Sequence, residues 1–325
     1  MGNPNVTIDG PKNEIPKNEA PSSTVSSEAL RIGVRPIPTT EPDLNDAVVA
    51  LIDAQLAESD ARLPAPTRER VRATVAAHPD IAEIVVDVSD AVIPIALDEA
   101  PQPGSAEDEP GDAAGAPRPE IAARVEAVAG RVRLTGKPIH LESLPVTVAV
   151  DAKNLAVDWV EDVDGVLWFD AGRKRPGFQA DGELQFDIDD ARAMFRAMAD
   201  AMAKEAQGRV KEVDFDVDIE RPMGGEQLVT LTGTLDGGCK FIGLRVSAHV
   251  VAALHNASAK VTVRDFSLKT SNPFAKLALF VFRKRIREWA STPFDLIPDL
   301  PEDYRVDALE LRTRGRAVTA TLRIR

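Results

Sequence analysis

Residues 213–220 read VDFDVDIE, an unbroken alternation of apolar and acidic side chains. Successive side chains of an extended strand point to opposite faces. Val213, Phe215, Val217 and Ile219 therefore share one face, and the four acids share the other. A strand with one apolar and one charged face is typical of an antiparallel sheet that packs on a core through one side only. This stretch predicts a half-buried antiparallel strand.

The sequence on both sides of this stretch continues the pattern of long strands. Further strands are expected at 139–150, 152–160, 166–170, 178–188, 227–235, 240–251, 258–270, 305–313 and 316–325. Asp236-Gly237-Gly238 predicts a hairpin turn between two of them, and Arg314-Gly315 joins the last two. The strands follow one another in groups, which favours an α+β class with an antiparallel sheet over a Rossmann-like fold.

Three helices separate these groups of strands. The first is an amphipathic segment at 119–134, with Pro119 near its start. The second covers 189–207, with Asp189 or Asp190 as its N-cap and Gly208 as its stop. The third runs over 273–290, after Asn272 as cap.

The region before residue 119 has a different character. All of the aromatic residues lie at or after Trp159, so the main core is expected in the second half. Four regions are predicted: a disordered tail (1–42), a short helical or extended docking segment (43–97), an acidic linker (98–118) and the main α+β domain (119–325). Within the docking segment, helices are expected at 43–61 and 67–77. Residues 81–97 read either as a strand or as an apolar docking element.

Composition excludes several classes of function. The formal net charge is −13, from 52 acidic and 39 basic residues, which argues against nucleic-acid binding. The single Cys239 cannot form a disulfide within the chain or a thiolate metal site, and it reads as a small core residue. The N-terminus lacks the apolar region of a secretory signal, and no apolar run reaches the roughly 18 residues that span a bilayer. We therefore expect a cytoplasmic protein.

The sequence carries none of the common catalytic signatures. The sequence has no nucleophile elbow, no phosphate-binding glycine loop and no paired-histidine metal motif. The histidines (His78, His140, His249 and His255) are scattered and read as surface or strand-end residues. The acids Asp158, Glu161, Asp162 and Asp164 read as a polar turn rather than a calcium loop. No catalytic residue, metal or cofactor is predicted.

Two helices could contact lipid. Residues 277–282 are apolar on every helix face, and the basic residues Arg283, Lys284, Arg285 and Arg287 follow directly. Such a segment is either a buried core helix with a charged end or a wedge that meets anionic lipid. In the helix at 189–207, Met194, Met198 and Met202 recur at a spacing of four, beside Phe195. This stripe is either ordinary core or the lining of a site for variable apolar chains. The basic loop Arg173-Lys174-Arg175 is an exposed turn or a weaker phosphate contact.

The C-terminal 35 residues read STPFDLIPDLPEDYRVDALELRTRGRAVTATLRIR. A Pro- and Leu-rich stretch is followed by a strand, a glycine turn and an alternating last strand. This order resembles the end of the actinobacterial LmeA-like phospholipid-binding proteins of the cell envelope. The residues that carry the resemblance are Pro293, Leu296, Pro298, Leu300, Pro301, Leu309, Leu311, Gly315, Val318, Ala320 and Leu322, and with the preceding helix and strands it covers about residues 119–325.

The resemblance implies a fold similar to the tubular lipid-binding (TULIP) proteins. In that fold a curved antiparallel sheet wraps around long apolar helices and encloses an elongated cavity for acyl chains. The family brings no fixed catalytic residues. This sequence departs from it in having a long acidic N-terminal extension and in lacking an export or anchor segment, which puts an envelope location in doubt.

These observations together predict non-enzymatic binding or transfer of phospholipid or another acyl-chain lipid, with attachment to an anionic membrane. Lipid contact is expected at Met194, Phe195, Met198, Met202, Phe274, Leu277, Phe280, Val281, Phe282 and Trp289, and head-group contact at Arg283, Lys284, Arg285 and Arg287. The expected location is the inner face of the plasma membrane. Two alternatives remain. One is a scaffold that recruits a membrane enzyme or transporter through 43–97, and the other is a lipid-directed enzyme.

Overall fold

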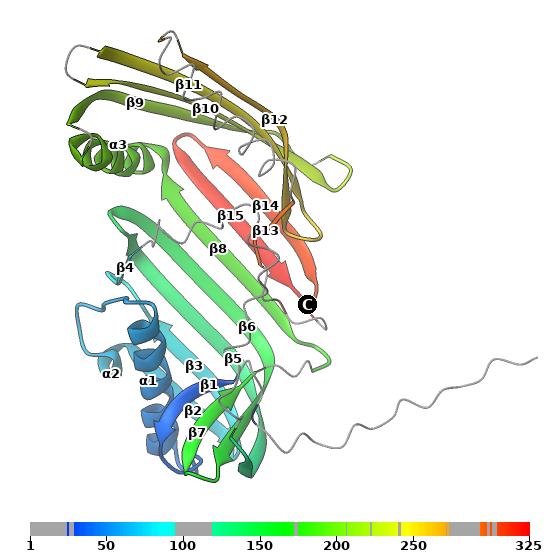
Figure 1. Ribbon diagram of the computed structural model, residues 1–325. Helices are drawn as coiled ribbons and strands as arrows, with labels where there is room; N and C mark the ends of the chain where they lie inside the picture. Colours follow the sequence, from blue (N-terminus) through cyan, green and yellow to red (C-terminus); the bar gives the residue numbers. More distant parts are fainter. Residues whose placement is uncertain are drawn as a thin grey trace, which may run out of the picture.

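The computed structural model shows two β-sheets and few helices, a sheet-rich α+β architecture (Figure 1). It describes residue 25 and residues 29–94, 119–171, 175–205, 207–221, 223–239, 242–270, 272, 293–297, 300 and 304–325. The third predicted helix (273–290) and the predicted linker (98–118) lie outside these residues.

Sheet 1 has ten strands and forms the long curved body of the molecule. Its main path runs in the order β14-β15-β8-β6-β5-β3-β2, with β7 and β1 continuing from β6 and with β4 beside β5. The pairs are antiparallel except that β3 and β4 lie parallel to β5. The strands are β1 (Leu30–Val34), β2 (Val71–Ala77), β3 (Asp80–Asp87), β4 (Val92–Ile93), β5 (Ile121–Leu141), β6 (Leu144–Asp162), β7 (Val166–Asp170), β8 (Gln179–Asp187), β14 (Val306–Arg314) and β15 (Ala317–Ile324).

Sheet 2 has five antiparallel strands in the order β13-β12-β11-β10-β9. Its strands are β9 (Gly208–Ile219), β10 (Glu226–Cys239), β11 (Ile242–His255), β12 (Lys260–Thr270) and β13 (Phe294–Asp295). Residues 213–219 of the alternating stretch VDFDVDIE form the second half of β9, so the predicted half-buried strand is confirmed.

The helices are α1 (Glu41–Glu58), α2 (Thr67–Arg70) and α3 (Ile188–Glu205). The helices predicted at 43–61 and 189–207 are therefore confirmed. The predicted N-cap of α3 was displaced by two or three residues, because the side chain of Asp187 accepts the hydrogen bond from the Asp189 amide at 2.7 Å.

The segment at 119–134 is a strand, so the predicted amphipathic helix is wrong. It forms much of β5, which pairs with β6 over almost its whole length. Small residues allow this packing: a Cβ at Gly130 would lie 3.0 Å from the Ala82 carbonyl oxygen of β3. The Ala-rich sequence favours a helix locally, and pairing on both sides overrides that preference.

Three further expectations are corrected. The helix predicted at 67–77 ends at Arg70, where the β-branched residues of β2 begin. Asp236-Gly237-Gly238 continues the β10–β11 ladder and is no turn. The strand predicted at 139–150 is interrupted by a turn at Glu142, whose φ is +55°.

The region before residue 119 belongs to sheet 1. β1 lies in the segment predicted to be a disordered tail (1–42), and it pairs with β7. The predicted docking segment supplies β2, β3 and β4. Of the two readings of residues 81–97, a strand or an apolar docking element, the structure shows the strand, over Asp80–Asp87. Leu44, Ala47, Val48 and Leu51 of α1 pack in a core with β2, β3, β5, β6 and β7.

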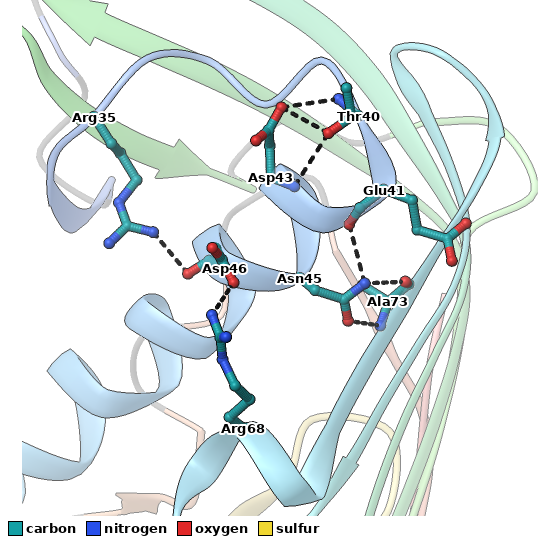
Figure 2. Close-up of polar contacts among 8 residues, drawn as sticks. All are labelled: Arg35, Thr40, Glu41, Asp43, Asn45, Asp46, Arg68 and Ala73. Atoms are coloured by element: carbon teal, nitrogen blue, oxygen red, sulfur yellow. Dashed lines mark hydrogen bonds and ion pairs between the residues drawn. The ribbon is translucent and has the colours of Figure 1, made fainter.

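Figure 2 shows how α1 is fixed to the edge of sheet 1. Thr40 and Asp43 form a capping box at its start, with the Asp43 amide donating to Thr40 Oγ1 at 3.3 Å. Asn45 donates to the Ala73 carbonyl oxygen at 2.7 Å and accepts from the Ala73 amide at 2.8 Å. This side chain takes the place of a neighbouring strand at the edge strand β2, which protects that edge from pairing with another chain.

A half-buried apolar surface as the candidate functional site

Sheet 2 has one apolar and one polar face. Val217, Leu231, Val250 and Phe266 lie side by side across β9, β10, β11 and β12. The adjacent row on the opposite face is Asp216, Thr232, His249 and Ser267. The polar row suits solvent, whereas the apolar row requires a partner of its own kind.

The apolar row is not fully covered. Val217, Val250 and Phe266 are half-buried, and Leu231 is 41% exposed. Fully buried core residues such as Leu254 in β11 are 1% exposed, so the incomplete burial is a property of this part of the sheet. This incompletely covered apolar row is the candidate binding surface of the described residues.

Helix α3 extends the apolar surface. Phe195 is 47% exposed and meets Phe215 of β9 edge to face, with ring centroids 5.4 Å apart. Met194, by contrast, is buried with Ile139, Leu144 and Val146 of sheet 1. Met198 is half-buried at the same contact. The methionine stripe therefore divides: Met194 is core, and the side of α3 that carries Phe195 is accessible.

Sheet 1 contributes a second apolar area. Leu134, Val150, Gly182 and Leu322 lie in one row across β5, β6, β8 and β15, and Val150 is 36% exposed. Because α3 packs against both Val148 in this face and Phe215 in sheet 2, it connects the two apolar areas. We call the accessible apolar side chains of α3, of this face and of the sheet 2 row the apolar surface.

Charged groups fix α3 against sheet 2. Arg192 forms ion pairs with Asp189 at 2.5 Å and with Asp214 at 2.8 Å, and donates to the Phe215 carbonyl oxygen at 2.8 Å. Asp189 also pairs with Arg316 from the β14–β15 turn. The position of Phe195 over Phe215 is therefore set by a network that joins α3, β9 and the C-terminal hairpin.

Gln227 joins the two sheets at the other end. Its side chain is 1% exposed and lies between the start of β10 and the edge strand β14. Its Nε2 donates to the carbonyl oxygens of Leu311 at 2.7 Å and Glu220 at 2.9 Å, and its Oε1 accepts from the Leu311 amide at 2.8 Å. Leu254 of sheet 2 packs on Val306 and Leu309 beside this contact.

Sheet 1 also carries a shallow hollow of about 660 Å³, lined mostly by charged and small residues, with Val150 and Leu322 of the apolar row among them. Arg323 pairs with Asp181 at 2.8 Å, and Arg131 donates to Asp151 at 2.9 Å. The hydrogen bonds from Arg131 hold the pKa of Asp151 below its usual value. Paired charges of this kind suit a solvated face, and we assign no chemistry to the hollow.

The other predicted residues have varied outcomes. Of the predicted lipid contacts, Phe274, Leu277, Phe280, Val281, Phe282 and Trp289 lie outside the described residues, as do Arg283, Lys284, Arg285 and Arg287. Met202 lies in α3. The predicted polar turn is confirmed between β6 and β7, where it includes Asp164, whereas Asp158 and Glu161 lie within β6. His255, one of the histidines predicted as surface or strand-end residues, is the last residue of β11, and its Nδ1 lies 3.3 Å from Glu226 Oε1.

Sequence reasoning did not single out Leu231, Val250 or Phe266, although the alternation of β10, β11 and β12 contains the signal. Within the described part of the chain, no group of His, Cys, Asp and Glu side chains is arranged to hold a metal ion. No helix there has the length and apolar character needed to cross a bilayer.

Comparison with known proteins gives no match: no family model fits the sequence, and no curated protein or solved structure is significantly similar. The resemblance to the LmeA-like proteins therefore stays a prediction.

Proposed function

We propose that this protein binds phospholipid or another acyl-chain lipid on the apolar surface, without covalent chemistry, and transfers it to or from an anionic membrane. The observation that carries the proposal is the incompletely covered row Val217, Leu231, Val250 and Phe266, which crosses four strands of sheet 2. Four strands span about 14 Å between their outer axes, a length suited to part of an acyl chain.

The energetics support a lipid as the ligand. Each CH₂ group buried from water stabilises a complex by about 0.8 kcal/mol, so a chain of modest length binds without polar contacts. Side chains such as Phe195 and Phe266 present broad apolar area, and Met198 adapts its shape to chains of different length. The basic residues Arg283, Lys284, Arg285 and Arg287 remain the proposed contact with anionic head groups, at the inner face of the plasma membrane.

The test is direct binding of a fluorescent acyl-chain lipid, with native mass spectrometry of the purified protein to detect co-purified lipid. Leu231→Gln should weaken binding several-fold, because it places an amide in the middle of the apolar row. The matched control is Val163→Gln, at an exposed apolar position of the β6–β7 turn that is 59% exposed. Equal affinity of the two variants, or a wild-type protein that takes up no lipid, would refute the proposal.

The scaffold alternative relied on residues 43–97 as a segment free to capture a partner. Its apolar residues Leu44, Val48 and Leu51 are buried in the core of sheet 1. Partner capture by that segment would require them to leave the core, so we favour the lipid proposal.

A further inference from the structure

Three exposed apolar side chains gather at one end of sheet 2. Met223 is 82% exposed in the β9–β10 turn, and Phe294 and Leu296, in and just after β13, are 48% and 44% exposed. We call these three side chains the tip. The β9–β10 hairpin projects at the right of Figure 1.

The backbone holds the tip in place. The Met223 and Glu226 backbones exchange two hydrogen bonds, of 2.7 and 3.2 Å, around Gly224 and Gly225. Both glycines have positive φ, +64° and +87°, which an L side chain rarely adopts. The Asn256 amide of the β11–β12 turn donates to the Gly225 carbonyl oxygen at 3.0 Å, which ties the two turns together.

The second part of the tip is fixed by pairing in the same sheet. Phe294 lies opposite Val261 and Asp295 lies opposite Lys260 in the β12–β13 pair. The Leu296 amide donates to the Ala259 carbonyl oxygen at 3.0 Å. β10 and β13 are three strand spacings apart, so the tip extends over about 14 Å.

The charged groups beside the tip largely pair with one another. Arg264 contacts both carboxylate oxygens of Glu226, at 3.0 and 3.1 Å, and Lys260 lies 3.9 Å from Asp295. These pairs leave little net charge to attract an anionic surface from a distance. Apolar insertion, rather than electrostatic attraction, is the interaction that this end of the molecule favours.

We propose that the tip inserts into the interfacial region of a lipid bilayer and so docks the protein on the membrane with which it exchanges lipid. The apolar face of an interfacial amphipathic helix is buried about 5–10 Å into the boundary between head groups and acyl chains, and we expect the side chains of the tip to reach the same region. The apolar face of sheet 2 continues to this end through Ile219 and Val229, which lie opposite each other in β9 and β10. A lipid leaving the bilayer at the tip meets this face next. The inference rests on the proposed function.

The experiment is flotation of the full chain with phosphatidylcholine vesicles and with vesicles that also contain phosphatidylglycerol, over a range of salt concentrations. The test variant is Met223→Ser with Phe294→Ser. The matched control is Val34→Ser with Val163→Ser, because these residues are 77% and 59% exposed elsewhere. Thermal denaturation checks that both variants fold, and Leu296→Ser provides a milder test at the same site.

The wild type should bind phosphatidylcholine vesicles with little dependence on salt, and phosphatidylglycerol should add a salt-sensitive part through the proposed head-group contacts. The test variant should lose about tenfold or more in partition coefficient, while the control stays unchanged. Uptake of a fluorescent acyl-chain lipid from solution, without vesicles, should be the same for all variants, which separates docking from the proposed lipid binding. Equal flotation of test variant and wild type would overturn the inference, as would binding that requires anionic lipid and disappears in salt.

Discussion

Asp162 organises the turn between β6 and β7 with one buried carboxylate. Its Oδ1 accepts from the amides of Asp164 at 3.0 Å and Val166 at 2.9 Å, and its Oδ2 accepts from Trp168 Nε1 at 2.9 Å. Burial by itself raises the pKa of Asp162, but these hydrogen bonds to the charged form outweigh it and leave the pKa below its usual value.

This lowered pKa makes stability depend on pH in a defined direction. A depressed folded-state pKa contributes stability above the unfolded value, near 3.9, and that contribution disappears as pH falls through the folded value. Asp162→Asn should therefore cost about 1–3 kcal/mol of unfolding free energy at neutral pH. The difference from wild type should shrink below about pH 4. Urea denaturation over this pH range is the measurement, and a difference that stays constant with pH would contradict the expectation.

Gln227 should contribute more to stability than Asp162, because its side chain forms hydrogen bonds that join β10 of sheet 2 to β14 of sheet 1. In Gln227→Leu, the buried amide and carbonyl groups of Leu311 lose their partner, at an expected cost of about 2–3 kcal/mol. Gln185→Leu, at an exposed position on β8, is the matched control and should be nearly neutral. Denaturant titration compares the two, and similar midpoints would show that Gln227 does not fasten the sheets.

The sequence indicated a structural role for Asp162 but not for Gln227. The acids around Asp162 are local in sequence, so their pattern predicts a polar turn. Gln227 and Leu311 are 84 residues apart, and nothing near either position indicates their contact. The accessibility of Phe195 and the burial of Met194 could not be separated either, because both depend on which sheet faces each side of α3.

At the scale of elements, the register shift of β9 against β10 depends on Gly237. A Cβ at this position would lie 2.8 Å from the Arg209 carbonyl oxygen, whereas a Cβ at Gly182 would meet Leu322 Cβ at an ordinary 3.8 Å. Gly237→Ala should therefore destabilise the protein by about 1–3 kcal/mol. Gly182→Ala should be neutral or slightly stabilising. Their melting temperatures compare the two directly, and equal values would mean that β9 relaxes freely.

The predicted elements succeeded where a local pattern agreed with the final packing. β9, the C-terminal hairpin and the helices α1 and α3 each carry a regular apolar period. The prediction for residues 119–134 was wrong because alanine favours a helix locally, whereas in β5 these small residues allow close packing against the neighbouring strands. The turn predicted at Asp236-Gly237-Gly238 was wrong for the same reason. Gly237 is needed because the neighbouring strand β9 leaves no room for a Cβ, and not because the chain turns there.

For the whole molecule, the structure predicts that the two halves of the chain do not fold independently. A protein that begins at residue 119 lacks β2 and β3 and exposes Ala127 and Ala129 of β5, which α1 and its neighbours otherwise bury. It should lose the cooperative melting by circular dichroism that the full chain is expected to show. Cooperative unfolding of 119–325 alone would restore the domain boundary at 98–118.

The pairing of β15 with β8 has a consequence for the order in which the protein can fold. β15 follows β8 in the chain only after α3, all of sheet 2 and β14, yet it lies inside sheet 1, between β8 and β14. A chain emerging from the ribosome keeps this edge of β8 open until β15 has been synthesised, and such edges pair readily with other chains. Folding should therefore be slow, as expected when contacts join residues far apart in sequence. During synthesis, the strand edge most open to pairing with other chains is therefore one that lies inside the finished sheet.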